Sequence, residues 1–451
     1  MGRSPRYSDA VMDRFLAKSP RSRSYFERAS RVIPSGSNRT VVFYKPYPAY
    51  SARAKGSHIW DIDGVERIDY CFNYSSLVLG HANPPVIEAV AAELENGLGR
   101  GQPTPAEVES AETITKMVPS AEMVKFTVTG TEAVMNAIRS ARAYMNKDDV
   151  VIFKGAYHGS SDPVSVDGLA FHSYGIPKDA QKHTTVVPFN DPGALEQTLR
   201  KNKRIAAVLM EPVLAAGGMV VPDEDFTKAV REITEKMDVL LILDEIVTGF
   251  RIARGGWQEK YGIKPDMTVL GKNVAGGMPG AAVCGRREIM EDVYAFPESE
   301  SLELRSPKTP LSGTYNAFPL TMAAGLATLK QLNSDVIEKI GNSAQSLSKG
   351  FVKVANDFGI NVRAPMVGSL FQYHFTNRDV VDIRAVRLAD SEMRRRLDLL
   401  LLNEGVYLSP GHFCCTSAAT TTADVQETLN SLEKALHEIR STARTVSALA
   451  K

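Results

Sequence analysis

Residues 239–245 read Val-Leu-Leu-Ile-Leu-Asp-Glu. Five consecutive apolar residues predict a strand that is buried on both faces, as in a parallel sheet covered by helices. Asp244 and Glu245 follow directly, at the strand end where open α/β sheets bind their ligands. A buried Asp is costly unless it meets a cation or a firm hydrogen-bond donor. The stretch therefore predicts an α/β fold with a polar site at this strand end; the alternative is a salt bridge to a neighbouring helix.

Further apolar strands alternate with helix-like stretches on both sides of this one. Such alternation favours a mainly parallel sheet with helices on both faces. The predicted strands are residues 150–153, 206–210 and 267–270, and the predicted helices are residues 85–96, 105–117 and 132–145.

The two ends of the chain have a different pattern. Residues 8–30 have apolar positions at helical spacing, and residues 50–70 read as short strands. The last part is dominated by helix-like runs at 319–333, 336–357 and 423–439. We therefore expect a small domain, formed by both ends, beside a large domain. The predicted division is residues 1–75 for the N-terminal part of the small domain, 76–325 for the large domain and 326–451 for the C-terminal part.

The composition excludes several classes of protein. Of the 451 residues, 43% are hydrophobic and 23% charged, with 53 Lys+Arg against 52 Asp+Glu. This balance gives no general attraction to nucleic acid or to an anionic membrane, and apolar stretches such as 205–210 are far shorter than the ~20 residues of a spanning helix. The first residues show no secretory pattern, and the four cysteines form no CxxC pair. We expect a cytoplasmic protein without disulfides or a metal site.

A second polar stretch reads Val128-Thr129-Gly130-Thr131-Glu132-Ala133, between a strand-like run and a helix. Small and hydroxyl residues at a helix N-terminus favour an anion site, because free amide N–H groups and the helix dipole point to one place. The alternative is a capping box, with Thr129 as N-cap and Glu132 as the third helical residue.

Two more predicted strands end in reactive or aromatic residues. Tyr157 and His158 stand between two glycines directly after one strand, so a flat ring can face a planar ligand there; the alternative is a turn with a half-buried Tyr. The strand 267–270 ends at Gly271-Lys272, followed by small residues. A Lys in such a pocket shifts its pKa readily and can act as a Schiff-base nucleophile. The alternative is a Lys that extends to solvent.

Together the four strand ends supply an anion cradle, an aromatic plate, a buried carboxylate and a lysine. These are the groups that pyridoxal 5′-phosphate (PLP) requires. We expect Gly130 and Thr131 to bind its phosphate and Tyr157 to stack on its ring. We expect Asp244 to keep the pyridine nitrogen protonated and Lys272 to form the Schiff base.

Over about residues 30–440 the chain resembles the class III, fold-type I aminotransferases. Within that class it most resembles the branch of glutamate-1-semialdehyde aminomutase and the β-phenylalanine aminotransferases. The motifs are TGTEA (129–133), GAYHG (155–159), EPV (211–213), LDEIVTGFR (243–251), PDMTVLGK (265–272), GGMPGAAVCGRREIM (276–290) and LSGTYNAFPLTMAAG (311–325).

The resemblance implies an architecture and further cofactor contacts. It implies a mainly parallel seven-stranded sheet in a large domain, a small α+β domain built from both termini, and a homodimer. It also implies a pyridoxamine 5′-phosphate form of the cofactor during turnover. In the family pattern, Thr314 reaches the phosphate in the neighbouring subunit, and Ile246 packs on the ring face opposite Tyr157. The other implied cofactor contacts are Thr129, His158 and Glu211.

The chain departs from the family at the expected carboxylate anchors. Ala216 stands where many members that act on α-amino acids have the Glu of a Glu–Arg switch, and Gly411 stands where the β-phenylalanine enzymes have an Arg. Arg39 lies in a segment that resembles their N-terminal Arg site, so it is the candidate carboxylate binder. The other candidate substrate contacts are Tyr74 and His412, which is a candidate partial replacement for the missing cation.

The predicted function is an aminotransferase that moves an amino group between an amine or β-amino acid and a ketone, aldehyde or keto acid by ping-pong chemistry. The ε-amine of Lys272, displaced by the substrate, is the predicted general base. Two alternatives stay open on the same scaffold: an intramolecular aminomutase of the glutamate-1-semialdehyde type, and an amino-acid racemase or epimerase. Among these, the aminotransferase alone needs an external carbonyl acceptor.

Overall fold

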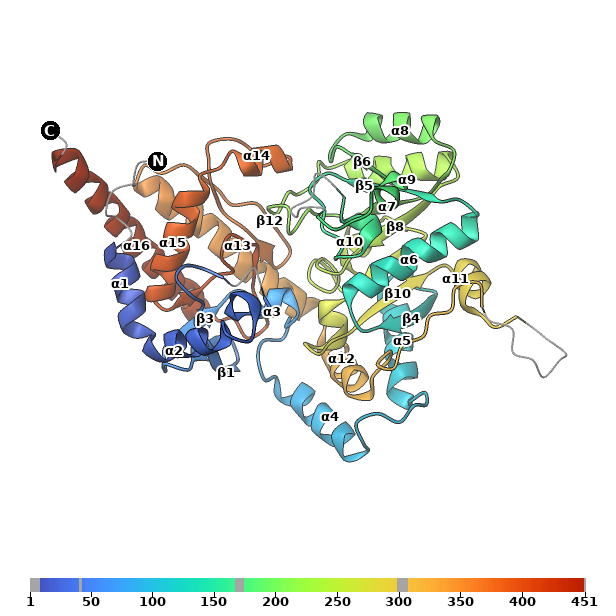
Figure 1. Cartoon of the computed structure of the whole chain (residues 1–451), viewed down its shortest axis with the longest axis horizontal. Helices are drawn as coiled ribbons and strands as arrows, with labels where there is room; N and C mark the ends of the chain where they lie inside the picture. The colour runs from blue at the N-terminus through green and yellow to red at the C-terminus, as the bar shows by residue number, and fades with distance from the viewer. Residues whose placement is uncertain (1–8, 40–42, 167–173, 298–306, 450–451) are drawn as a thin grey trace.

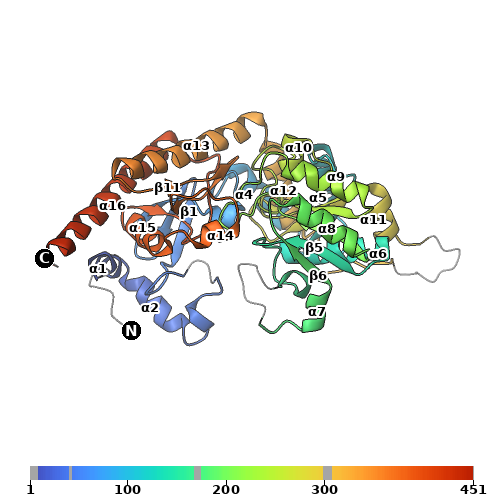
Figure 2. The ribbon, with the colours of Figure 1, turned by 90° about the horizontal axis from the view of Figure 1, so that it is seen from above.

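The computed structural model describes residues 9–39, 43–166, 174–297 and 307–449. Figure 1 shows two lobes side by side, one built around a large sheet and the other containing both ends of the described chain. Helices α1 (Asp9–Lys18) and α16 (Thr422–Leu449) lie in the same lobe in both views (Figures 1 and 2).

The large lobe is organised by a seven-stranded sheet. Its strand order is β4-β10-β9-β8-β7-β5-β6. The run from β6 to β9 is parallel, and β10 is antiparallel to both of its neighbours. The sequence therefore predicted a mainly parallel seven-stranded sheet correctly. The strands are β4 Met123–Thr127, β5 Asp149–Phe153, β6 Thr184–Val187, β7 Ile205–Met210, β8 Leu240–Asp244, β9 Met267–Leu270 and β10 Ala281–Gly285.

Helices cover this sheet, which explains the unbroken apolar runs of its central strands. All residues of β5, β7, β8 and β9 are buried. Helix α6 contacts strands β4 and β7–β10, whereas α9 contacts β8 and also packs on α8. The helices of this lobe and its border are α4 Pro84–Glu95, α5 Pro105–Met117, α6 Gly130–Met145, α7 Lys178–Lys182, α8 Pro192–Lys201, α9 Phe226–Lys236, α10 Gly256–Tyr261, α11 Arg287–Tyr294 and α12 Pro319–Gln331.

The second lobe joins segments from the two ends of the chain in one sheet. Its order is β1-β2-β3-β15, and β15 pairs in parallel with β3, so that Val406 lies opposite Ile68. Two short antiparallel sheets complete the lobe, β11-β14 and β12-β13-β16. The strands are β1 Ser51–Lys55, β2 His58–Asp61, β3 Glu66–Asp69, β11 Val362–Arg363, β12 Met366–Val367, β13 Leu370–Phe371, β14 His374–Phe375, β15 Val406–Tyr407 and β16 Cys414–Cys415.

Amphipathic helices pack around these small sheets. Helix α13 packs on α16, and α15 contacts α1, α16 and β15 (Figure 2). Their apolar faces enclose a core of their own, separate from the core that surrounds the large sheet. The helices not yet given are α2 Pro20–Ala29, α3 Phe72–Ser75, α13 Ser334–Asp357, α14 Ile383–Arg387 and α15 Ser391–Asn403.

Two further properties of the described residues bear on function. None of the described helices combines the length and the apolar character that crossing a membrane requires. Within the same part of the chain, His, Cys, Asp and Glu side chains do not gather in groups of three or more suited to a metal ion.

Candidate functional site

A cavity of about 210 Å³ lies at the carboxyl ends of the parallel strands. It brings together groups that follow β4, β5, β7, β8 and β9, as expected for the ligand edge of an open α/β sheet. Most of the predicted cofactor contacts line it. The lining residues are Thr129, Gly130, Thr131, Tyr157, Gly159, Glu211, Val213, Asp244, Ile246, Val247, Thr248 and Lys272.

The anion-binding end of this cavity is the N-terminus of α6. Thr129 is the N-cap, and its Oγ1 accepts a hydrogen bond from the amide of Glu132 at 3.2 Å. The Glu132 carboxylate in turn accepts from the amide of Val128 at 2.9 Å. The capping arrangement is therefore present, and it is compatible with an anion site, because the amides at the start of a helix have no partners within the helix. Thr131 Oγ1 accepts from the amide of Ser160 at 3.3 Å, which ties the cradle to the loop after β5.

Two glycines leave the space that the cradle needs. A Cβ on Gly130 would lie 2.8 Å from Ile246 Cδ1. Gly159 has φ +88°, and a Cβ there would lie 2.5 Å from Thr131 Oγ1. Any larger residue at either position would therefore displace a side chain that lines the cavity.

Asp244 ends β8 and is 3% exposed. Its Oδ2 lies 2.7 Å from His158 Nδ1, and its Oδ1 accepts from the amide of Ile246 at 3.1 Å. His158 does not line the cavity; it lies fully buried behind Asp244, and its Nε2 has no hydrogen-bond partner in the described part of the chain. In this structure His158 contacts Asp244, and its predicted contact with the cofactor stays a prediction. An ionised Asp244 accepts from Nδ1–H, which fixes the orientation of the carboxylate.

Glu245 lies on the other side of the strand end. It is 1% exposed and accepts hydrogen bonds from Thr248 Oγ1 at 2.9 Å and from the amide of Trp257 at 2.7 Å. Gln258 donates to it through both its amide and its side chain. The salt bridge to a helix, considered as the alternative for this stretch, is wrong for both carboxylates: Asp244 pairs with His158, and Glu245 binds neutral groups at the start of α10.

Lys272 lies in the wall of the cavity and is partly buried. It begins a short 3-10 turn after β9 with φ +50°, a left-handed conformation that is uncommon outside glycine and that marks functional sites. Burial lowers the pKa of its ammonium group, while the nearby carboxylates of Asp244 and Glu211 oppose this shift. The alternative of a lysine extending into solvent is therefore not what the structure shows.

Glu211 follows β7 and supports the aromatic side of the cavity. Its carboxylate accepts hydrogen bonds from the amides of Tyr157 and Ala215. Burial raises the pKa of Glu211 to about 7, with Asp244 contributing in the same direction and His158 opposing it. The Tyr157 side of the cavity is open, since Tyr157 remains 41% exposed.

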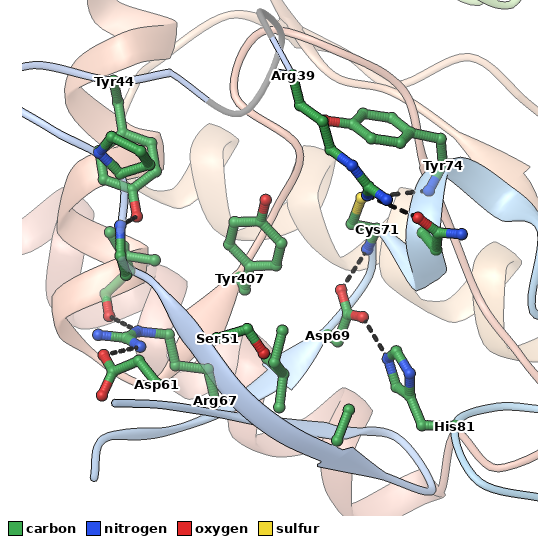
Figure 3. A pocket seen from close by; sticks show the side chains of 16 residues that line it. Arg39, Tyr44, Ser51, Asp61, Arg67, Asp69, Cys71, Tyr74, His81 and Tyr407 are labelled. Atoms are coloured by element: carbon green, nitrogen blue, oxygen red, sulfur yellow. Dashed lines mark hydrogen bonds and ion pairs between the residues drawn. The ribbon is translucent and has the colours of Figure 1, made fainter. Parts of the chain in front are cut away.

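A second cavity, of about 280 Å³, lies in the small lobe and is lined by residues of the N-terminal segment, of the sheet β1-β2-β3-β15 and of α15 (Figure 3). Arg39 lies at one end of it, exposed, with Nη1 donating to Asn73 Oδ1 at 2.7 Å and its guanidinium 5.9 Å from the centre of the Tyr74 ring. The predicted carboxylate binder is thus paired with a neutral amide and keeps its charge available. Residues 40–42, which follow it in the family-like segment, lie outside the described residues.

The wall that carries Tyr74 is a left-handed turn. All four residues of α3, Phe72–Ser75, have positive φ, between +42° and +67°, although none is glycine. Each such residue costs roughly 1–2 kcal/mol, so surrounding contacts must hold the turn. Asp69 accepts from the amides of Cys71 and Phe72, and the fully buried Arg251 donates to the carbonyl of Ser75 at 2.9 Å. This role of Arg251 could not be predicted from the sequence, because no motif identifies a cation that supports a strained turn.

His412 also contacts the ring of Tyr74. The ring centres are 6.1 Å apart in a T-shaped arrangement, and both His412 Nδ1 and Tyr74 Oη are buried without a partner among the described residues. Burial, with the charges of Lys272 and Arg394, lowers the pKa of His412 to about 4. The lowered pKa favours a neutral imidazole at neutral pH, which argues against the predicted role of His412 as a partial replacement for the missing cation.

Thr314 does not line the cavity of its own chain. It is exposed, beside the exposed ring of Tyr315, in the segment that leads to α12. This position leaves its predicted contact with a neighbouring subunit as a prediction.

Comparison with known proteins places these features in a family. The family described as "Aminotransferase class-III" matches residues 42–436. A glutamate-1-semialdehyde 2,1-aminomutase of Methanocaldococcus jannaschii is 38% identical over 428 residues, which are 92% of this chain and 98% of that protein.

Solved structures extend the comparison to the fold. An omega-transaminase from Sphaerobacter thermophilus has a TM-score of 0.87 and 35% identity, covering 93% of this chain and 98% of that one. A glutamate-1-semialdehyde aminomutase variant from Pseudomonas aeruginosa PAO1, in complex with pyridoxamine 5′-phosphate (PMP), has a TM-score of 0.87 and 28% identity, covering 95% and 96% of the two chains.

Proposed function

The chain belongs to the class-III aminotransferase family, and from this premise we propose that it is an aminotransferase acting on amines or amino acids that carry at most one carboxylate. The cofactor of the family is PLP. The observation that supports the proposal most is the placement of Lys272, Asp244 and the α6 cradle around one cavity.

The residues of this cavity have the chemical groups that PLP requires. The first amides of α6 and the hydroxyl of Thr131 suit a phosphate group, and Gly130 and Gly159 leave room for it. Asp244 supplies the buried carboxylate that a protonated pyridine nitrogen needs. When bound, PLP supplies an aldehyde that receives the amino group and a ring that stabilises negative charge on the substrate carbon.

Each side chain then has a task of its own. The Asp244 carboxylate, oriented by His158, holds a proton on the ring nitrogen. The Nζ atom of Lys272 moves a proton to and from the substrate carbon, and its lowered pKa favours the neutral amine that this work requires. Tyr157 and Ile246 stand among the cavity-lining residues as the candidates for the two faces of the ring.

The substrate class follows from the charges near the two cavities. Arg39 is the candidate anchor for one carboxylate, since its hydrogen-bond partner Asn73 is neutral. His412 adds no positive charge at neutral pH. Ala216 stands at the position of the Glu in the Glu–Arg switch of many family members, so this chain lacks that Glu. Amines and β-amino acids with a single carboxylate therefore suit the site better than dicarboxylic donors.

An intramolecular aminomutase is the second candidate. A specific observation favours it, because the relative at 38% identity from M. jannaschii is named as one. The two functions differ in whether an external carbonyl acceptor is consumed.

A half-reaction decides between them. Purified enzyme loaded with PLP is mixed, without acceptor, with a panel of amines, β-amino acids and α-amino acids, and the absorbance of the aldehyde and amine forms of the cofactor is followed. Complete conversion by one donor class supports the aminotransferase. Absence of conversion, together with isomerisation of glutamate 1-semialdehyde or of a chiral amino acid, contradicts it in favour of a mutase or racemase. Lys272→Ala is the control that should not turn over.

Arg39→Met tests the carboxylate anchor. Loss of a charge-assisted hydrogen bond costs about 1.5–3 kcal/mol, so KM for β-amino acids should rise roughly tenfold to hundredfold, whereas KM for amines without a carboxylate should stay unchanged. Equal effects on both donor classes would argue that Arg39 has no part in carboxylate binding.

We also propose a homodimer in which Thr314 reaches the phosphate of the neighbouring subunit's cofactor. The exposure of Thr314 and Tyr315 is compatible with this role. Light scattering should give a dimer mass, and Thr314→Val should weaken cofactor binding without changing that mass. A monomer with full activity would contradict the proposal.

A further inference from the structure

Helix α15 contains a buried ion pair, Arg394 and Asp398, one turn apart. Arg394 Nε lies 2.9 Å from Asp398 Oδ1 and 3.2 Å from Oδ2, and their side chains are 7% and 6% exposed. A buried pair of charges is costly to desolvate and gains little stability over apolar residues of the same size. Its remaining hydrogen bonds therefore indicate what the pair does.

Both charges hold the loop of residues 409–413. Arg394 Nη2 donates to the carbonyl of His412 at 3.1 Å, and Asp398 Oδ2 accepts from the amide of Gly411 at 3.0 Å. Gly411 has φ +64°, so the loop needs a left-handed residue at this point. The pair thus binds the backbone of the loop at two successive residues, Gly411 and His412, immediately beside the imidazole of His412.

Tyr373 completes the support from the adjacent strand segment. Its carbonyl accepts from Arg394 Nη1 at 2.7 Å, its hydroxyl donates to Asp398, and its ring lies 3.7 Å beneath the Arg394 guanidinium. All three guanidinium nitrogens thus donate to acceptors inside the protein.

The loop presents His412 to Tyr74. As described above, the two rings meet edge to face, and each has one buried polar atom, Nδ1 and Oη, without a partner among the described residues. Buried polar atoms normally have hydrogen-bond partners. These two atoms belong to adjacent side chains, and Tyr74 lines the second cavity, which points to a ligand group that completes them.

We infer that Arg394 and Asp398 are positioning residues, which hold His412 beside Tyr74 as a neutral hydrogen-bonding contact for the part of the substrate distant from the reacting amine. This inference rests on the proposed function and deepens it. The class of substrate it names is an amine or amino acid whose distal group is uncharged and hydrogen-bonding, such as a hydroxyl, amide or ether.

The test compares Arg394→Lys with a matched control at another buried pair. Arg231 and Asp266 lie 2.7 Å apart with side chains 12% and 7% exposed, and Asp266 also accepts from the amide of Leu241, near the amino ends of β8 and β9. Arg231→Lys thus makes the same chemical change at the sheet edge opposite Lys272. Lysine keeps the charge but not the planar fork that binds several acceptors at once.

The first readout needs no cofactor. Amide hydrogen exchange of peptides covering residues 409–413 should become about tenfold faster in Arg394→Lys and stay unchanged in Arg231→Lys. The second readout is the half-reaction. KM for donors with a hydroxyl or amide at the distal end should rise about tenfold in Arg394→Lys, with kcat within twofold, whereas KM for simple alkylamines should stay within twofold.

A double-mutant cycle links the effect to His412. In a His412→Ala background, Arg394→Lys should change KM by less than twofold, because its target is already absent. Fully additive effects would overturn the inference, as would unchanged exchange of the loop. If the Arg394→Lys variant does not fold, the double variant Arg394→Met/Asp398→Leu takes its place in both measurements, because it removes the two buried charges together. If no donor converts the wild-type enzyme, the proposed function fails, and the exchange experiment still decides whether the pair holds the loop.

Discussion

Replacing Asp244 by Asn removes one negative charge from the cofactor cavity while preserving shape. Asp244 is 3% exposed and is oriented by His158 at 2.7 Å. A protonated ring nitrogen at the usual charge-assisted hydrogen-bond distance of about 2.8 Å would interact with this carboxylate by about 6 kcal/mol at an effective dielectric constant of about 20. An Asn retains a neutral hydrogen bond worth about 1 kcal/mol, so about 5 kcal/mol is lost, which corresponds to roughly 10³–10⁴-fold in rate.

The assay is the single-turnover half-reaction of PLP-loaded enzyme with the donor that proves best for the wild type. Cofactor occupancy is measured by absorbance, so that a loss of rate is separated from a loss of binding. The neighbouring Glu245→Gln is the matched control, because Glu245 is equally buried but faces away from the cavity. It should lower thermal stability and leave the rate per bound cofactor within a few-fold. A decrease of less than tenfold in Asp244→Asn at full occupancy would refute the reasoning.

Three further predictions test other parts of the site. Lys272→Ala should abolish turnover, as measured with saturating PLP and donor, while circular dichroism stays that of the wild type; intact activity would contradict the account. Gly159→Ala adds a methyl group 2.5 Å from Thr131 Oγ1 at φ +88°, so PLP affinity measured by fluorescence titration should fall at least about tenfold. The Glu211 carboxyl keeps its proton in the folded apoprotein up to a pKa of about 7, above its ordinary value of 4.5, so stability falls as pH rises between these two values. The change in melting temperature caused by Glu211→Gln should accordingly be more favourable at pH 8 than at pH 5, and an equal change at both pH values would refute the assignment.

Periodicity and apolar runs predict the strands β5, β7, β8 and β9 and the helices α4, α5 and α6 of the large lobe, but not β6 or the helices α8 and α9. Strand β9 and helix α5 have the predicted bounds, and helix α6 begins two residues before the predicted 132–145. Strand β10, Ala281–Gly285, was missed, because its small residues form no long apolar run and it is antiparallel to its neighbours. Its burial comes from the strands on either side, which a local pattern does not contain.

The chemical groups of the site are predictable because each follows a recognisable strand. How these groups are arranged relative to one another is not predictable from the sequence. Successive residues of a strand point to opposite faces, so Asp244 enters the cavity and Glu245 does not, but the sequence alone leaves open which of the two faces is the cavity. His158 illustrates the same limit: its motif indicates proximity to the cofactor, and only the fold shows that it supports Asp244 from behind.

The substrate side shows the strongest dependence on tertiary structure. The left-handed turn of Phe72–Ser75 contains no glycine that would have predicted it. Asp69 and Arg251 stabilise the turn by binding its backbone. The neutral state of His412 likewise follows from burial rather than from its neighbours in sequence. Contacts between residues far apart in the chain decide both features, and no local pattern encodes them.

Lys272 should hold the cofactor covalently in the cavity formed by α6, Asp244 and Tyr157. Borohydride reduction of PLP-loaded enzyme, followed by peptide mass mapping, tests it most directly, since reduction makes the link between cofactor and lysine permanent. We expect one pyridoxyl group per chain, on Lys272. A pyridoxyl group on another lysine, in enzyme that was active before reduction, would contradict it.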